Sequence, residues 1–299
     1  MPALRLGAAG DEARLSGVSA RFLSPAVSAR VRTLRLTVAY DGAGFAGWQR
    51  QQAQRTVQGD LEQVVSAIEG APVHVAGAGR TDAGVHAAAM VASIQLTAEI
   101  SPERLVRACN ATLLPDVRVL AAEEVAGRFH ARLHARGKTY RYYIWNAPAG
   151  QPALRRASWH VPQPLSLATM QDIARTFEGE HDFAAFQAQG SDVQTTVRRM
   201  FTSTVEPDGA MPGWCAPPDD RGRLLCFEVS GDGFLRHMVR VMAGTLVMAG
   251  KGRFTPAQVT KALAGGGRDS AGPTAPAYGL HLWRVHYPPE GPEPLAPSP

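Results

Sequence analysis

Residues 77–87, GAGRTDAGVHA, place one carboxylate, Asp82, close to a basic side chain in a segment rich in glycine and alanine. Its three glycines permit positive φ and let a ligand or another backbone come close, which is typical of a loop. A carboxylate in such a loop can serve as a nucleophile or as a general base. An ordinary turn is the alternative, because Asp-Ala-Gly is common turn chemistry. The residues alone leave both roles open.

A second group of residues suited to chemistry is basic and aromatic. Residues 128–145 contain Arg128, Arg132, Arg136, Lys138 and Arg141, interleaved with Tyr140, Tyr142, Tyr143 and Trp145. The whole chain has 31 basic and 26 acidic residues and therefore a net charge of +5. Basic side chains beside aromatic rings suit phosphates and unstacked bases, which favours RNA as a partner. A solvated basic surface is the alternative.

Histidine and cysteine give little support to a metal site. His130 and His134 are four residues apart and on a helix could present two ring nitrogens to one zinc ion. They precede a predicted strand, and no third ligand has a recognisable spacing, so we expect no metal. The three cysteines form no CxxC pair, which argues against a disulfide framework and indicates a reducing, cytoplasmic compartment. No segment has the pattern of a signal peptide or a membrane span.

Hydrophobic periodicity predicts the same order of elements, β-α-β-β-α-β, in two successive halves of the chain. In residues 31–135 the predicted strands are 33–41, 73–79, 88–96 and 117–125, and the predicted helices are 56–70 and 101–113. In residues 136–290 the predicted strands are 138–146, 195–206, 222–231 and 279–287, and the predicted helices are 166–179, 234–250 and an extra one at 255–266.

This order predicts an α+β fold. Its two tandem halves form a mainly antiparallel sheet with helices on one face and a groove between the halves. The segment 77–87 joins the second and third strands of the first half, so we expect it beside that groove. Outside this scheme lie an N-terminal extension, 1–30, expected to be flexible, an insertion, 207–222, and a tail, 291–299.

The segment 77–87 resembles the catalytic motif of the pseudouridine synthases, and its Gly-Arg-Thr-Asp-Ala-Gly-Val-His run resembles that of the TruA family. Other segments resemble that family in the same order along the chain: 40–51, 56–63, 110–119, 129–146, 182–186, 231–246 and 275–285. The resemblance covers residues 33–287, and leaves the extension, the insertion and the tail without an assigned role.

The resemblance implies an enzyme that isomerises uridine to pseudouridine at positions thirty-eight to forty, in the anticodon arm of tRNA. Such a reaction breaks the bond from N1 of uracil to C1′ of ribose and rejoins the base through C5, without net oxidation or hydrolysis. It requires a carboxylate and neither a cofactor nor a metal. The resemblance also implies a homodimer in which both subunits touch one tRNA.

Match to the family motifs implies roles for four residues. Asp82 would be the nucleophile or base, and Tyr140 the aromatic residue that stacks on the target uracil. Arg80 would enter the space left by the displaced nucleotide, which must be flipped out before Asp82 can reach it. Arg240 corresponds to a basic residue that pairs with the catalytic aspartate. Its segment has helical spacing and is largely apolar, and a buried arginine there requires an anion.

Three further residues are predicted to contact RNA, namely Lys138, Arg141 and His86. Two other functions are considered for this sequence. A non-catalytic RNA-binding protein with tandem RRM-like domains would share the order of elements, but no RNP-type run occurs on the third strand of either half. A metal-dependent nuclease requires clustered acidic ligands, whereas Asp82 is alone in its loop.

Overall fold

The computed structural model of the protein describes residues 30–125, 127–188, 190, 193–208 and 222–288. Nearly all of the predicted extension and insertion, and the whole predicted tail, lie outside these described residues. The elements below belong to one compact unit that begins at Val31. Within this part of the chain, no helix is both long and apolar enough to cross a membrane.

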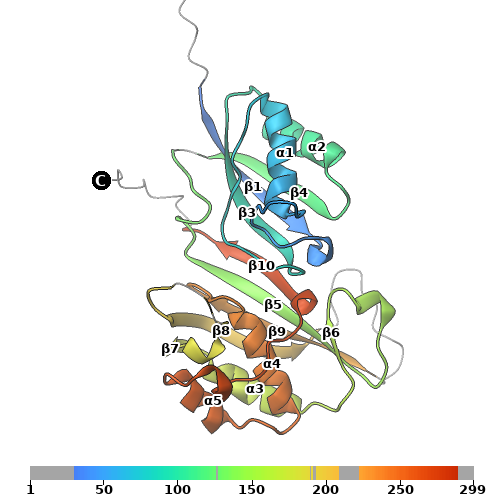
Figure 1. The fold of residues 1–299 in the computed structure, drawn as a ribbon, viewed down its shortest axis with the longest axis vertical. Coiled ribbons are helices and arrows are strands. Elements are labelled where there is room, and N and C mark those ends of the chain that lie inside the picture. The colour runs from blue at the N-terminus through green and yellow to red at the C-terminus, as the bar shows by residue number, and fades with distance from the viewer. Residues whose placement is uncertain (1–29, 126, 189, 191–192, 209–221, 289–299) are drawn as a thin grey trace, which may run out of the picture. The chain divides into compact units, whose positions relative to one another are not determined.

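The described strands form one ten-stranded sheet, drawn in Figure 1. The strands are β1 (Arg32–Tyr40), β2 (Ala76–Gly77), β3 (His86–Leu96), β4 (Val117–Val125), β5 (Gly137–Asn146), β6 (Trp159–Val161), β7 (Gly179–Asp182), β8 (Val197–Pro207), β9 (Arg223–Gly231) and β10 (Leu280–His286). Their order is β4-β1-β3-β10-β5-β9-β8-β7, with β2 paired to β3 and β6 paired to β5. All pairs are antiparallel except β10 with β3 and β6 with β5. The predicted α+β class and mainly antiparallel sheet are confirmed.

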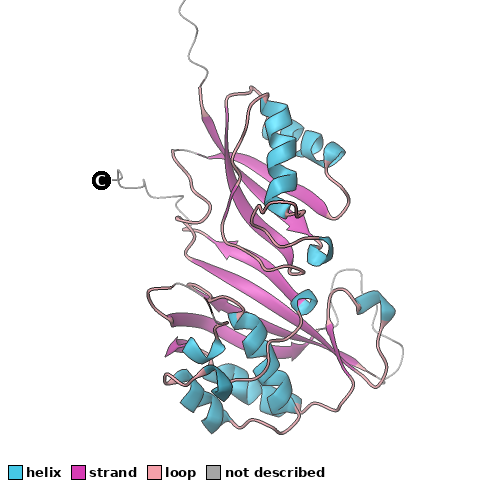
Figure 2. Cartoon of the chain, viewed as in Figure 1, coloured by secondary structure: helices cyan, strands magenta, loops and turns pink. Residues whose placement is uncertain are grey.

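The described α-helices are α1 (Val57–Glu69), α2 (Pro102–Thr112), α3 (Leu167–Thr176), α4 (Met238–Gly250) and α5 (Pro256–Leu263). Four of them begin at a Ser or Thr whose side chain accepts a backbone N–H of the first turn: Thr56, Ser101, Ser166 and Thr255. Figure 2 shows the helices in two groups along the sheet, α1 and α2 in one and α3, α4 and α5 in the other.

The main hydrophobic core lies between the helices and one face of the sheet, and it includes residues of both helix groups. On β5, Tyr140, Tyr142 and Ile144 belong to this core. The opposite face of the sheet carries a second, smaller cluster: Tyr143, Trp145, Ala147, Leu154, Leu224 and Cys226. Because side chains alternate along a strand, the two faces of β5 have different surroundings.

Strand β10 joins the two predicted halves of the sheet. It is the last strand of the chain, yet it lies between β3 and β5 and pairs with both. The sheet is therefore continuous across the predicted boundary between residues 135 and 136. A strand that pairs on both edges is stabilised by two ladders of hydrogen bonds, whereas two separate sheets would each leave an open edge there.

Smaller differences concern where elements begin. The predicted helix 234–250 begins only at Met238, because His237 has φ +61°, outside the helical range. The predicted strand 73–79 is reduced to the two residues of β2, in a segment whose glycines weaken strand pairing. The short strands β6 and β7 were not predicted.

Candidate active site

Asp82 lies in the loop between β2 and β3, which we call the Asp82 loop (residues 78–85). Backbone hydrogen bonds fix this loop to the chain that follows β1: Trp48 N donates to Thr81 O at 3.1 Å, and Gly84 N donates to Phe45 O at 3.3 Å. Gly47 has φ +101°, and any Cβ there would crowd Thr81 O. These contacts hold the carboxylate on a rigid support.

The start of helix α4 lies next to Asp82. Arg240 Nη1 is 3.5 Å from Asp82 Oδ2, and His237 Nε2 is 3.4 Å from the same oxygen. Arg240 is itself oriented by a hydrogen bond from its Nε to Ala275 O, at 2.8 Å. The predicted pairing of Arg240 with Asp82 is confirmed. Among the described residues, no hydrogen bond reaches Oδ1, so this oxygen is left for other partners.

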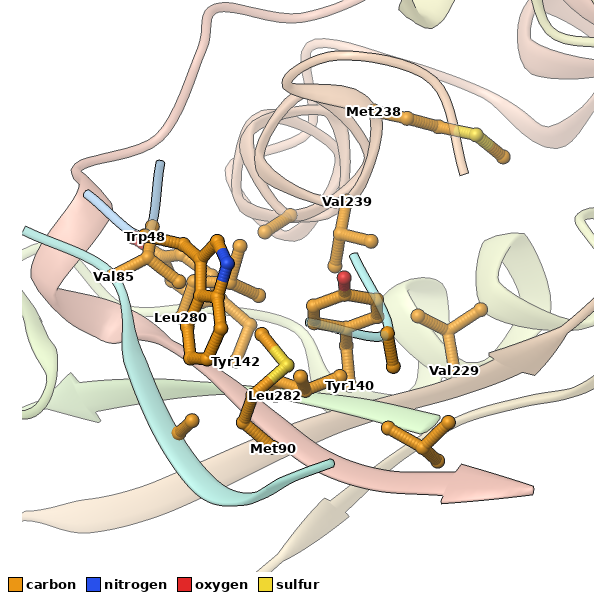
Figure 3. Close-up of a cluster of buried hydrophobic side chains, with 14 of the residues drawn as sticks. Trp48, Val85, Met90, Tyr140, Tyr142, Val229, Met238, Val239, Leu280 and Leu282 are labelled. Carbon is orange, nitrogen blue, oxygen red and sulfur yellow. The ribbon is translucent and has the colours of Figure 1, made fainter. Parts of the chain in front are cut away.

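Tyr140 lies on β5 under the start of α4. Figure 3 shows its ring between the sheet and the helix, with its hydroxyl directed toward α4. Phe234 packs against the ring edge-on, at 4.9 Å between centroids, and the side chain is 9% exposed. Burial, and to a smaller extent the charge of Asp82, raises the pKa of the Tyr140 phenol. The phenol is therefore protonated at neutral pH and can donate a hydrogen bond.

Asp82 and Tyr140 line an open groove of about 1420 Å³. The groove also contains basic side chains from five separate segments: Arg80, Arg132, Lys138, Arg198 and Arg236. Arg80 is exposed, whereas Lys138 is half-buried with its side chain against Gly79. Burial, aided by the charge of Arg132, lowers the pKa of Lys138. An anion in the groove would meet several cations, none of which has a described carboxylate partner.

Arg141 is not in this groove. Its side chain extends from the opposite face of β5, where its Nε donates to Glu228 Oε2 at 2.6 Å and its guanidinium stacks on Trp283 at 3.9 Å. The sequence placed Arg141 beside Tyr140 but did not show which face of the strand carries the core. The structure therefore places Arg141 outside this groove, and its predicted RNA contact stays a prediction.

His86 is buried and points away from the groove. It is 5% exposed, its Nδ1 accepts the N–H of Gly42 at 3.1 Å, and its ring stacks on His281 at 4.6 Å. Because Nδ1 accepts a hydrogen bond and burial lowers the pKa, we assign neutral imidazole to His86. The structure therefore places His86 in the interior and outside the lining of the groove, and its predicted RNA contact stays a prediction.

The histidine pair considered for zinc does not form a ligand set. Residues 131–133 form a turn, in which His134 N donates to His130 O at 3.2 Å, and not a longer helix. The Nδ1 of His134 accepts His130 N–H at 3.0 Å, and the Nδ1 of His130 accepts Arg132 N–H at 3.1 Å. Within the described part of the chain, no three histidine, cysteine or acidic residues are grouped as metal ligands would be.

Sequence reasoning missed the contact of His237 with Asp82. Its signal in the sequence was weak: His237 precedes Arg240 by three residues, which suggests a shared helix face. The actual contact depends on the positive φ of His237, which nothing in a histidine side chain predicts.

Comparison with known proteins shows the family of this chain. The family model described as tRNA pseudouridine synthase matches residues 36–132 and 173–288. A tRNA pseudouridine synthase A from Pelobacter propionicus is 44% identical over 257 residues, which cover 86% of this chain and 100% of that protein. A protein of the same name from Ruminiclostridium cellulolyticum is 40% identical over 257 residues, with the same coverage.

A third relative of that name, from Moorella thermoacetica, is 42% identical over 256 residues, which cover 85% of this chain and 99% of the relative. The matched segments contain Asp82 and the start of α4, whereas Tyr140 lies between the two segments. This chain belongs to the tRNA pseudouridine synthase family and is an isomerase.

Proposed function

We propose that this enzyme converts uridine to pseudouridine at positions thirty-eight to forty of the tRNA anticodon arm, without a cofactor, and that Asp82 is its nucleophile or general base. The observation that carries the proposal is the carboxylate of Asp82 between Arg240 and Tyr140 in a basic groove. The similarity to several proteins named tRNA pseudouridine synthase A supports tRNA as the substrate.

The roles of the three residues follow from their contacts. Arg240 donates a hydrogen bond to Oδ2 of Asp82 at 3.5 Å and holds that oxygen in place. Oδ1 can then attack the substrate or take a proton from it. The protonated phenol of Tyr140 supplies a donor beside Asp82, and its ring supplies an apolar surface for the uracil. The base can thus be detached, turned and rejoined inside one pocket.

Access to a paired base requires base flipping, which costs a few kcal/mol. Arg80 and Lys138 line the groove near Asp82 and offer positive charge to the phosphates that flank the flipped nucleotide. Arg80 is exposed and long enough to fill the space that the nucleotide leaves. We propose that these two residues hold the open conformation of the RNA and that the enzyme acts on tRNA in the cytoplasm.

The direct test replaces the carboxylate by its neutral isostere. We expect Asp82→Asn to bind tRNA like the wild type and to form no pseudouridine, because an amide is neither a nucleophile nor a base at this position. Pseudouridine is measured by nucleoside mass spectrometry after incubation of tRNA with the purified protein, in the presence and absence of EDTA. Asp232→Asn is the matched control, since Asp232 lines the same groove but is exposed.

Two outcomes would contradict the proposal. Substantial pseudouridine formation by Asp82→Asn would remove Asp82 from the chemistry. Loss of wild-type activity in EDTA, with recovery on adding zinc, would require a metal that the proposed mechanism does not use.

A further inference from the structure

His237 has an unusual backbone conformation for a residue with a side chain. Its φ is +61° and its ψ is 1°, a left-handed conformation that glycine and asparagine adopt most readily. Met238 N donates to Leu235 O at 3.1 Å, so His237 occupies the third position of a tight turn just before α4. Apart from Ala53, no other non-glycine residue in the described ranges has positive φ. Strain of this kind is often found at functional sites.

The turn directs the imidazole of His237 at Asp82. Its Nε2 is 3.4 Å from Oδ2, and the side chain is 23% exposed at the wall of the groove. A helical conformation would add His237 to the first turn of α4 and change the direction of its side chain. Residue 237 is thus a histidine in a backbone conformation that favours glycine, and its ring contacts the carboxylate of Asp82.

The protonation state of His237 decides whether His237 or Asp82 can donate a hydrogen bond to the other. Burial is the largest influence on His237 and lowers its pKa, and the charges of Arg240 and Arg236 act in the same direction, against the opposing charge of Asp82. The ring is therefore neutral at neutral pH. A carboxylate has no proton to donate, so only the tautomer with hydrogen on Nε2 can donate to Oδ2, which lies 3.4 Å away.

We propose that His237 is a positioning residue for Asp82: together with Arg240 it holds Oδ2 and leaves Oδ1 directed at the uracil. This inference rests on the proposed function. The terminal torsion of an aspartate side chain is broad and nearly two-fold, so a single donor permits the two oxygens to exchange. His237 Nε2 and Arg240 Nη1 lie 3.4 and 3.5 Å from the same oxygen, and two such contacts restrict the rotation of the carboxylate.

Two variants separate the hydrogen bond from the backbone strain. His237→Gly removes the imidazole and relaxes the positive φ, so it keeps or raises thermal stability. His237→Gln retains an amide N–H at the position of Nε2. Single-turnover reactions with enzyme in excess over tRNA give the rate constant at saturation and the enzyme concentration at half-saturation, and Asp82→Asn serves as the inactive reference.

We expect His237→Gly to lower the saturating rate constant by about 10- to 100-fold, the effect of a misplaced reactive group, while half-saturation changes by less than about threefold. His237→Gln should recover most of that rate. Asparagine, which tolerates the left-handed conformation and has an amide N–H, replaces glutamine in this test if His237→Gln fails to fold.

The inference is overturned if His237→Gly reacts within about twofold of the wild type, since misplacement should cost far more. It is also overturned if the glycine and glutamine variants are equally slow, or if only half-saturation changes. A wild-type protein inactive on tRNA would refute the proposed function and this inference together. An active wild type beside an equally active His237→Gly would refute the inference alone.

Discussion

At the scale of single residues, the site consists of one carboxylate, that of Asp82, and three side chains near it. Both Arg240 and His237 approach Oδ2 of Asp82, whereas the described residues leave Oδ1 without a hydrogen bond. The two oxygens are chemically equal in free aspartate, so their difference here comes entirely from the surroundings. The third side chain is that of Tyr140, which is protonated, packs edge-on against Phe234 and lies on the sheet.

Tyr140→Phe tests the hydroxyl apart from the ring. We expect turnover to fall by about 10²-fold or more, the effect of removing a group that transfers a proton, while tRNA binding changes little because the ring still stacks. Single-turnover rates and filter-binding affinities measure the two effects. Tyr143→Phe is the control, since Tyr143 lies on the opposite face of the same strand. Equal losses of rate and affinity in Tyr140→Phe would indicate a structural tyrosine.

At the scale of elements, helix α4 depends on the chain segment 271–276, which packs along it. Gly244 on α4 faces Pro273, and a Cβ there would overlap the carbonyl oxygen of Pro273. Two hydrogen bonds link the same segment to Arg240: Ala275 N donates to Arg240 O at 3.0 Å, and Arg240 Nε donates to Ala275 O at 2.8 Å. The same segment, 271–276, therefore both packs against α4 and orients Arg240.

Gly244→Ala should disturb both the packing of α4 and the orientation of Arg240. We expect a loss of about 1–3 kcal/mol in the free energy of unfolding, as for other overpacked sites. Activity should also fall, because segment 271–276 must move and it carries the carbonyl that orients Arg240. Gly267→Ala is the control, since a Cβ at Gly267 meets nothing within 4 Å. Urea unfolding and pseudouridine formation measure the two effects, and a Gly244→Ala protein with full activity would contradict the coupling.

A second element-scale feature is the pair of histidines that joins β3 to β10. His281 is opposite His86 in the parallel register, and their rings stack. Burial, and then the neighbouring His86, lowers the pKa of His281 to about 3. The unfolded chain binds this proton near pH 6.5, so between that pH and the folded value the unfolded state binds more protons. Acidification in this window therefore destabilises the fold.

His281→Phe should reduce this acid sensitivity. From the two pKa values, His281 alone accounts for about 2 kcal/mol of unfolding free energy lost between pH 7 and pH 5. Phenylalanine keeps a ring between His86 and Tyr143 but has no proton to bind. Urea unfolding at the two pH values measures the loss, and an equal loss in the variant and the wild type would show that the pair does not carry the effect.

At the scale of the whole molecule, the basic groove is the surface that an extended RNA would follow. Its cations come from the Asp82 loop, the turn that contains Arg132, β5, β8 and the turn before α4, so several parts of the chain contribute charge to the groove around Asp82. Binding that depends on such charges weakens as salt rises, because the release of counterions from RNA is less favourable at higher salt. A groove of this kind holds one part of a tRNA, and contact with the rest requires more surface.

We therefore expect a two-fold dimer that binds tRNA with both subunits. Light scattering should give a mass of twice the 31.9 kDa chain at the concentrations used for the activity assay. The same measurement with tRNA added gives the number of chains per complex. A monomer with full activity would refute the proposed dimer.

Local patterns in the sequence were sufficient for most elements of the fold. Helices α1, α2, α3 and α5 begin at a Ser or Thr cap, as their sequences indicate. Alternating strands such as β1 and β9 were predicted within about a residue of their ends. The resemblance carried by residues 77–87 was enough to single out Asp82. These features depend on neighbours along the chain, and a sequence displays such neighbours directly.

The tertiary structure decided what depends on residues far apart in the chain. The place of β10 between β3 and β5 follows from pairing across more than a hundred residues, so no local period reveals it. Which face of β5 is buried decided that Tyr140 lies in the groove and Arg141 outside it. The contact of His237 with Asp82 required a positive φ that the surrounding turn imposes. Local propensity is weak compared with the packing of a whole core, and packing therefore determined these three features.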